Sequence, residues 1–139
     1  MEVKFKKLQP DARLPEYAHR GDAGADLFSL EDKTLQPGER YVFKLGLAAE
    51  FSNDLVAMIS DKGGLAGQSG ITTLAGVIDA GYRGEWVAVL LNTSQQPYEF
   101  KRGDKLAQVI FQKIDRPQFK ESELSETTRA DGKFGSTGR

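Results

Sequence analysis

The chain has 139 residues, of which 39% are apolar and 28% charged, with a formal net charge of -1. This composition is typical of a single folded domain and argues against a broad basic surface that could wrap duplex nucleic acid. No apolar stretch reaches the roughly 20 residues that span a bilayer, and the N-terminus lacks the apolar segment of a signal peptide. Cysteine is absent, which excludes disulfides and thiolate metal sites. These features predict an intracellular, cytoplasmic protein with no nucleic-acid or membrane partner.

Short apolar stretches alternate with turn residues along most of the chain. Gly, Pro, Asn and Asp separate these stretches at intervals of roughly 8–12 residues, the pattern of an all-β sandwich or barrel. Helix signals are weak, because residues 64–70 contain several glycines and could form only a turn or two. Strands are expected at 3–8, 25–29, 40–47, 55–59, 85–92 and 106–114.

The character of the chain changes at about residue 115. Residues 116–139 are polar and charged, and their last ten positions are rich in glycine. Such a composition usually marks a disordered tail. A lone aromatic residue, Phe134, lies among glycines and hydroxyl residues, and a disordered tail seldom needs one. The tail is therefore a candidate functional segment as well as a candidate disordered one.

Carboxylates are the best candidates for acid–base chemistry. A Ser-His-Asp triad or a multi-histidine metal site would have to use the only histidine, His19, whose neighbours show no metal-ligand spacing. Asp26 follows a turn of small residues, and Asp79 directly follows Val77 and Ile78. A carboxylate on an apolar run is costly unless the site uses it. The alternative is that each aspartate only fixes a turn. Mg²⁺ is the metal that suits such oxygen ligands.

Residues 76–85, GVIDAGYRGE, are expected to form a strand, a tight turn at positions 80–81 and a second strand. In a functional interpretation, the apolar pair before Asp79 anchors it at the mouth of a site and Tyr82 lies beside a ligand. In the alternative, Tyr82 packs in the core.

Two further stretches are suited to phosphate. Residues 60–70 place Lys62 beside paired glycines, which could form an anion cradle or only a mobile surface loop. The pattern of a Walker P-loop is absent from the sequence. Residues 129–138 combine an arginine, hydroxyl residues and Phe134, groups that suit phosphate and a flat base.

Taken in order, five stretches resemble the five motifs of the trimeric dUTPase family, the deoxyuridine 5'-triphosphate nucleotidohydrolases. These stretches are AGADLFS, GLAGQSGI, GVIDAGYRGE, RGDKLAQVIF and RADGKFGSTG. The resemblance covers almost the whole chain. It implies a jelly-roll-like β-barrel over residues 1–115 and a mobile C-terminal arm over residues 116–139.

The resemblance also implies an activity and an assembly. The expected reaction is hydrolysis of dUTP to dUMP and pyrophosphate with Mg²⁺, which limits uracil incorporation into DNA and supplies dUMP for thymidylate synthesis. The expected assembly is a homotrimer in which each active site is built from all three chains.

Particular residues acquire roles through this resemblance. Asp79 would activate the water that attacks the α-phosphorus, and Asp26 would approach Mg²⁺ through water, with no direct protein ligand to the metal. Tyr82 would lie against the deoxyribose, and Phe134 would stack on uracil. The residues expected to bind substrate are Lys62, Gly63, Gly64, Gly76, Val77, Ile78, Tyr82, Gln108, Arg129, Phe134, Gly135, Ser136 and Thr137.

The chain departs from the family pattern at three positions. Gly63 replaces a serine whose hydroxyl normally meets the phosphates, and a missing polarising donor can reduce a rate by roughly 10²-fold. Lys62 replaces an arginine, which keeps the charge but loses the bidentate fork. Ala75 stands where many members carry asparagine.

Two alternative functions stay open. A dCTP deaminase shares the fold, but it needs a glutamate on the strand after the hairpin, where this chain has Val89. A catalytically weak dUTPase-like regulator would explain Gly63, whereas the presence of Asp79, Arg129 and Phe134 argues against it.

Overall fold

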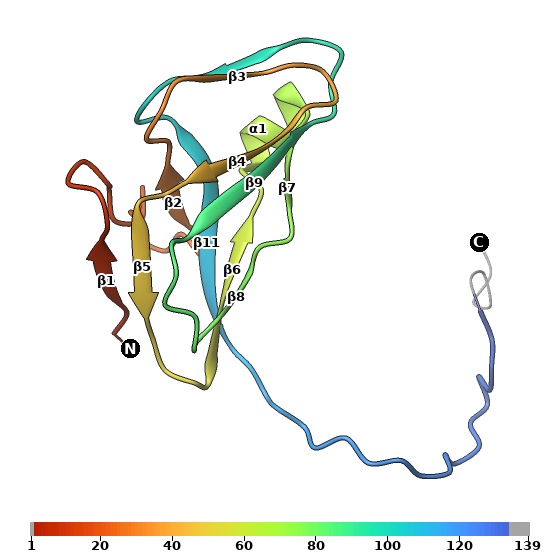
Figure 1. Ribbon diagram of the computed structural model, residues 1–139. Helices are drawn as coiled ribbons and strands as arrows, with labels where there is room; N and C mark the ends of the chain where they lie inside the picture. The colour runs from red at the N-terminus through yellow and green to blue at the C-terminus, as the bar shows by residue number, and fades with distance from the viewer. Residues whose placement is uncertain (1, 134–139) are drawn as a thin grey trace.

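The computed structural model describes residues 2–133 and consists of short antiparallel strands with one short helix (Figure 1). The all-β prediction is therefore confirmed. In chain order the elements are β1 (Lys4–Lys7), β2 (Ala25–Phe28), β3 (Lys33–Leu35), β4 (Arg40–Lys44), β5 (Leu47–Glu50), β6 (Leu55–Ser60), α1 (Gly63–Ser69), β7 (Ile71–Leu74), β8 (Val77–Asp79), β9 (Val87–Asn92), β10 (Tyr98–Phe100) and β11 (Lys105–Lys113).

Two sheets position the candidate site residues. A four-stranded sheet has the order β2-β11-β6-β8, and a three-stranded sheet has the order β4-β9-β7. Two smaller pairs, β1-β5 and β10-β3, complete the strand pairing of the described residues. Strands that are distant in sequence lie side by side, since β11 contacts both β2 and β6 (Figure 1).

The core lies between the sheets and is rich in aromatic rings. On β9 every second side chain is buried, which is the pattern of a strand with one face on the core. Trp86, Phe43 and Phe100 are fully buried, and the Phe5 ring packs edge-on against Trp86 at 5.3 Å. Each such side chain contributes roughly 1.5–3 kcal/mol by leaving water.

Two sequence predictions about strands are wrong. The expected strand at 40–47 ends at Lys44, because Gly46 adopts a left-handed conformation with φ 63° and the chain enters another sheet with β5 at Leu47. The expected hairpin at 76–85 does not form, because β8 pairs with β6, whereas β9 pairs with β4 and β7. The expected second strand also begins at Val87 rather than Glu85.

Other differences are small. Strands β3, β7 and β10 were not predicted, and each has only three or four residues, too few to show a clear alternation. The expected helical turn at 64–70 is observed as α1, one residue earlier. No helix within residues 2–133 is long and apolar enough to cross a membrane.

After β11 the chain leaves the sheets and extends away from them (Figure 1). Residues 114–128 have no helix or strand assignment, and nearly all are exposed. Two apolar side chains in this segment, Phe119 and Leu124, are 95% and 92% exposed. Within residues 2–133, this segment therefore buries little apolar surface against the core.

Candidate active site

A pocket of about 260 Å³ opens beside β8. Its wall combines the apolar side chains of β7 and β9 with the polar groups of Asp79, Tyr82 and Glu85. An apolar pocket with a few polar groups at its edge is the usual form of a small-molecule site. The predicted residues that line it are Gly76, Val77, Ile78, Asp79 and Tyr82.

The backbone before β8 is held tightly against β6. Gly76 has φ 113°, a conformation that favours glycine, and an added Cβ would collide with the carbonyl oxygen of Ile59. The Ile59 amide donates a hydrogen bond to the Gly76 carbonyl at 2.8 Å. Ala75, just before it, is also left-handed with φ 62°. Asparagine adopts this conformation more readily than alanine, which agrees with the asparagine that the family pattern leads us to expect here.

Only half of the apolar pair before Asp79 acts as an anchor. Ile78 is buried at 9% exposure, whereas Val77 is 68% exposed. This alternation follows from the strand geometry, because successive side chains point to opposite faces. Asp79 therefore shares the outer face of the sheet with Val77, and Asp79 is exposed at the edge of the pocket.

Tyr82 is fixed over the turn rather than packed in the core. Its amide donates to the Asp79 carbonyl at 3.0 Å, and its hydroxyl donates to the Glu85 carbonyl at 3.1 Å. An added Cβ at Gly84 would collide with the Tyr82 hydroxyl, so this glycine makes room for the ring. With 46% of its surface exposed, Tyr82 is available to a ligand, and the alternative of a core tyrosine is wrong.

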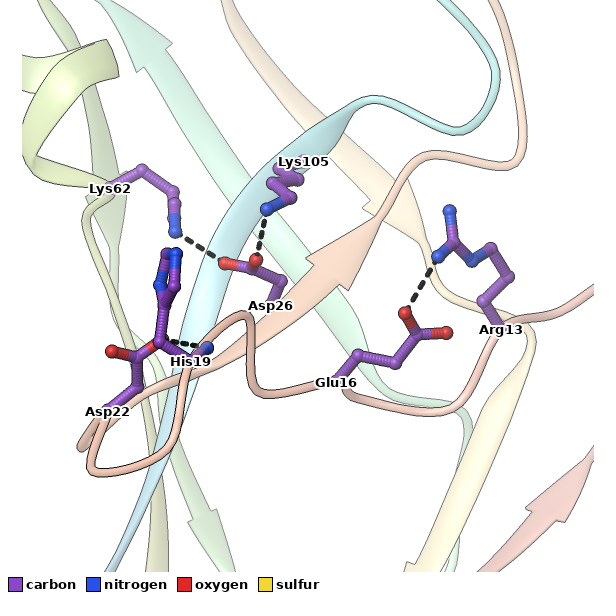
Figure 2. A network of polar contacts seen from close by, with 7 residues as sticks. All are labelled: Arg13, Glu16, His19, Asp22, Asp26, Lys62 and Lys105. Atoms are coloured by element: carbon purple, nitrogen blue, oxygen red, sulfur yellow. Dashed lines mark hydrogen bonds and ion pairs between the residues drawn. The ribbon is translucent and has the colours of Figure 1, made fainter.

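The other candidate carboxylate, Asp26, forms an ion-pair cluster on β2. Figure 2 shows Lys62 and Lys105 reaching its carboxylate from two directions. Lys105 Nζ lies 2.6 Å from Asp26 Oδ2, and Lys62 pairs with Oδ1. Asp26 is 2% exposed, so its charge needs such partners.

The pKa of Asp26 reflects two opposing effects. Burial raises the pKa, but hydrogen bonds from Lys105 and Lys62 and their positive charges outweigh this effect. The pKa of Asp26 therefore lies below its ordinary value. The carboxylate therefore stays ionised at neutral pH. Two ammonium groups on one carboxylate leave this cluster with a net positive charge, which suits an anionic ligand.

The glycine turn beside this cluster is open. Lys62 is the N-cap of α1 and makes no side-chain capping bond. An added Cβ at Gly63 or Gly64 would meet no atom of the described chain within 4 Å. Their amide groups therefore lie on an accessible surface, and a serine would fit at position 63.

Gln108 connects β2, β6 and the glycine turn. It lies opposite Asp26 on one side and Ser60 on the other, and its side-chain amide donates to the Asp61 carbonyl at 2.8 Å. Gly24 permits this arrangement, because a Cβ there would overlap the Gln108 amide.

The two carboxylates of one chain lie well apart on the same sheet face. Asp79 is opposite Val56 on β6, whereas Asp26 lies in the row of Ser60. Four residues of strand span about 13 Å. Within one chain, the structure brings Lys62, Gln108 and Asp26 together but leaves Asp79 in a separate region.

Arg129 does not approach either region of its own chain. It lies in the extended tail, where its Nε donates to the Gly132 carbonyl at 3.3 Å. The remaining predicted residues, Phe134, Gly135, Ser136 and Thr137, lie outside the described part of the chain.

Neither His19 nor a cluster of carboxylates forms a metal site within residues 2–133. The backbone amide of His19 donates to Asp22 at 2.9 Å in the turn before β2 (Figure 2), and its side chain is 83% exposed. Among residues 2–133, no group of three or more His, Asp or Glu side chains is arranged to hold a metal ion.

Comparison with known proteins decides the family. The dUTPase family model matches residues 10–138. The chain belongs to the dUTPase family. It is 46% identical to a deoxyuridine 5'-triphosphate nucleotidohydrolase from Thermobifida fusca, over 98% of this chain and 78% of the relative.

Solved dUTPase structures share the same fold. A mutant dUTPase from Staphylococcus bacteriophage 80alpha, solved with dUpNHpp, matches with a TM-score of 0.91 at 26% identity and covers 99% of both chains. A phage phi11 dUTPase mutant, described with a structural Mg(II) ion, matches with a TM-score of 0.84 at 27% identity, over 91% of this chain and 100% of that chain. The prediction of a dUTPase-like jelly-roll barrel is thus confirmed.

Sequence reasoning missed several dUTPase residues around the site. Lys105 lies within the fourth motif but was not singled out, although it is a primary partner of Asp26. Arg83 follows Tyr82 in the turn after β8; its Nε lies 3.9 Å from Glu50, and a terminal nitrogen donates to the Ala80 carbonyl at 2.6 Å. No sequence signal marked Asp61, which accepts hydrogen bonds from Thr72 and Thr73.

Proposed function

We propose that this protein hydrolyses dUTP to dUMP and pyrophosphate, as a dUTP diphosphatase. The observation that carries this proposal is the pocket beside β8, with Asp79 and Tyr82 at its edge. The family membership and the similarity to deoxyuridine 5'-triphosphate nucleotidohydrolases support the same substrate.

Asp79 is proposed to orient and deprotonate the water that attacks the α-phosphorus. Its carboxylate is exposed at the end of β8 and fixed by backbone pairing to Val56. A general base in such a position contributes roughly 10²–10⁴-fold to a rate. Proton transfer to Asp79 and attack by the resulting hydroxide would release pyrophosphate and leave the oxygen from water on dUMP.

The pocket is proposed to hold the uracil and the sugar. The backbone of residues 76–78 would pair with the uracil edge, since the Gly76 conformation keeps this segment fixed against Ile59. Tyr82 would lie against the deoxyribose, where its ring leaves no room for a 2'-hydroxyl. A site of this kind rejects ribonucleotides by steric exclusion.

Lys62, Gly63, Gly64 and Gln108 are proposed to line the phosphate side. In the structure Lys62 is paired with Asp26, so a bound triphosphate would compete for the Lys62 ammonium. Lys105 would then hold the Asp26 charge alone.

The chain's donor groups fit a Mg²⁺ ion bound mainly by the substrate. This cation commonly uses one or two carboxylates together with phosphates and waters, and Asp26 is an ionised carboxylate with a lowered pKa. Asp26 would approach the ion through water, because Lys105 still occupies one of its oxygens. Mg²⁺ would supply charge neutralisation on the leaving pyrophosphate.

A homotrimer with shared sites is proposed as the working assembly. The outer face of the four-stranded sheet carries an apolar row, Ile110, Met58 and Val77, of which Val77 is 68% exposed. The separation of about 13 Å between the rows of Asp26 and Asp79 fits sites that combine residues of different chains.

Residues 1–115 are proposed as the barrel core and residues 116–139 as an arm that closes over substrate on another chain. The exposed Phe119 and Leu124 support this proposal, because such side chains gain by packing on a partner. Arg129 would then contact the terminal phosphate of a substrate bound to another chain. The cytoplasmic location stays a prediction.

Incubation with nucleotide and Mg²⁺ tests the function directly. We expect dUMP and pyrophosphate from dUTP, with ¹⁸O from labelled water in dUMP alone. Release of ammonia from dCTP would instead indicate a deaminase, and tight binding of dUTP without turnover would indicate a regulator.

A further inference from the structure

Helix α1 has little of its own to hold it in place. It contains Gly63, Gly64 and Gly67 among seven residues, and none of its side chains is buried. Glycine is a much weaker helix former than alanine. The N-cap residue, Lys62, makes no side-chain bond to the free amides. Leu65 is half-buried and packs against the core, and the rest of the turn is positioned by its flanking segments.

The C-terminal flank is fixed by ordinary backbone contacts. Gly70 has φ 66° and its amide donates to the Ala66 carbonyl at 3.2 Å. The Thr93 amide and hydroxyl both donate to the Gly70 carbonyl, at 2.8 Å and 2.7 Å. These bonds tie the end of the helix to the segment after β9.

Asp61 fixes the N-terminal flank through both its side chain and its backbone carbonyl. Its Oδ1 accepts hydrogen bonds from the Thr73 amide at 2.5 Å and the Thr73 hydroxyl at 2.6 Å, and its Oδ2 accepts one from the Thr72 hydroxyl at 2.8 Å. Its backbone carbonyl accepts the Gln108 bond. Asp61 thus joins the end of β6 to β7, which belongs to the other sheet.

We propose that Asp61 is a positioning residue for the phosphate-binding turn at Lys62, Gly63 and Gly64. The Asp61 carboxylate closes the loop that contains α1 at its base, where β6 and β7 diverge. It fixes the direction in which the backbone leaves β6 and so aims the two glycine amides. This inference rests on the proposed function, since it assigns Asp61 to the phosphate half of that site.

The protonation state of Asp61 agrees with this role. Burial raises the pKa of Asp61, but the hydrogen bonds from Thr73 and Thr72 outweigh this effect. The pKa therefore lies below its ordinary value. Asp61 is therefore an ionised acceptor of three bonds at neutral pH. Bonds to a charged acceptor are the stronger kind.

Asp61→Ala, Asp61→Asn and Thr73→Val test the inference by comparing two ligands. One is the imido analogue dUpNHpp, which carries three phosphates, and the other is deoxyuridine, which carries none. For Asp61→Ala we expect dUpNHpp affinity to fall about tenfold, the scale for losing charged hydrogen bonds, and deoxyuridine affinity to stay within about twofold. Thr73→Val keeps the amide bond and should lose about threefold toward dUpNHpp. Asp61→Asn should recover most of the loss, because its side-chain oxygen can still accept from Thr73.

Glu39→Ala is the matched control. Its carboxylate accepts bonds from the Lys33 ammonium at 2.6 Å and the Gln36 amide at 2.8 Å, in the turn between β3 and β4. We expect both affinities to match the parent protein. If Asp61→Ala and Thr73→Val weakened both ligands equally, or left dUpNHpp affinity unchanged, Asp61 would have only a structural role or none.

The parent protein separates this inference from the proposed function. Hydrolysis of dUTP by the parent with unchanged dUpNHpp affinity in Asp61→Ala would overturn the positioning role alone. A parent protein that bound dUpNHpp no more tightly than deoxyuridine would overturn both, because the turn would then hold no phosphates.

Discussion

The pocket beside β8 and the glycine turn before α1 are built in opposite ways. At Gly76 the backbone lies so close to Ile59 that no side chain fits, whereas at Gly63 an added Cβ would meet nothing within 4 Å. The pocket is shaped by contacts within the chain. The turn is an open surface, held at its flanks by Asp61 and Gly70. The proposed base pocket is rigid and can set which nucleotide binds, whereas the proposed phosphate side is open and can accept groups from substrate and partner chains.

Asp79 lies at the edge of the rigid region, so changing it should have the largest effect. Asp79→Asn keeps the size of the side chain but removes its basicity. Turnover of dUTP should fall roughly 10²–10⁴-fold, with dUpNHpp affinity within about threefold of the parent. Steady-state rates and a binding titration measure the two quantities, and Asp115→Asn in the exposed tail serves as control. Turnover near the parent level would show that another group activates the water.

Deleting residues 129–139 should strongly reduce the function of the open glycine turn and have little effect on the rigid pocket beside β8. Without Arg129, the proposed clamp on the terminal phosphate is lost, and kcat/KM should fall by roughly 10²-fold or more. The melting temperature should stay within a few degrees of the parent value, because the described part of this segment is exposed. Full activity in the truncated protein would contradict the arm model, as would aggregation.

Gly63→Ser restores a hydroxyl in the open turn without steric conflict. If that hydroxyl assists the phosphates in relatives, the rate should rise, by up to roughly 10²-fold. Gly67→Ser is the matched control, since its added Cβ would also meet nothing and it lies further along α1. An unchanged or lower rate for Gly63→Ser would mean that the turn compensates for the hydroxyl in another way.

Gly76→Ala tests the rigid side of the comparison. Alanine would be strained at φ 113° and would collide with Ile59, so the free energy of unfolding should fall by about 1–3 kcal/mol. Gly81→Ala, in the turn after β8 where nothing lies within 4 Å, should leave the free energy of unfolding nearly unchanged. Denaturant titrations give both values. Equal stability in the two variants would show that contacts with β6 do not shape the pocket.

Acid stability reports on the Asp26 cluster and gives the smallest expected effect. The folded-state pKa of Asp26 is lowered, so its stabilising contribution is present above the unfolded-state pKa of about 3.9 and is lost as pH falls through the folded value. Lys105→Ala removes one lowering contact and should move the acid-unfolding midpoint upward by about half a pH unit. Lys44→Ala, at an exposed lysine 4.0 Å from Glu85, should leave it unchanged. A midpoint that did not move would show that Lys105 does not stabilise ionised Asp26.

Sequence patterns marked residues that line the pocket more readily than residues that hold other groups in place. Asp79, Tyr82 and Lys62 stand in ordered motifs, so their types and spacing were informative. Asp61 contacts β7, a strand that was not predicted, and Lys105 contacts Asp26 on β2, which is distant in the sequence. Such contacts depend on strand pairing, and local patterns carry no information about it.

The same limit applies to the fold. Alternating apolar residues predicted most strands, but the change of sheet at Gly46 and the separate partners of β8 and β9 depend on long-range packing. A left-handed glycine inside an apolar stretch looks like any other glycine in the sequence. The exposure of Val77 beside the buried Ile78 could have been expected from strand alternation.

Comparison of four nucleotides tests the central claim most directly. The rates of hydrolysis of dUTP, dCTP, dTTP and UTP are measured at equal concentration with Mg²⁺. Because the pocket beside β8 is proposed to read uracil and Tyr82 to exclude a 2'-hydroxyl, dUTP should be hydrolysed at least about 10²-fold faster than the other three. Comparable hydrolysis of all four, or no hydrolysis of dUTP, would contradict the assignment.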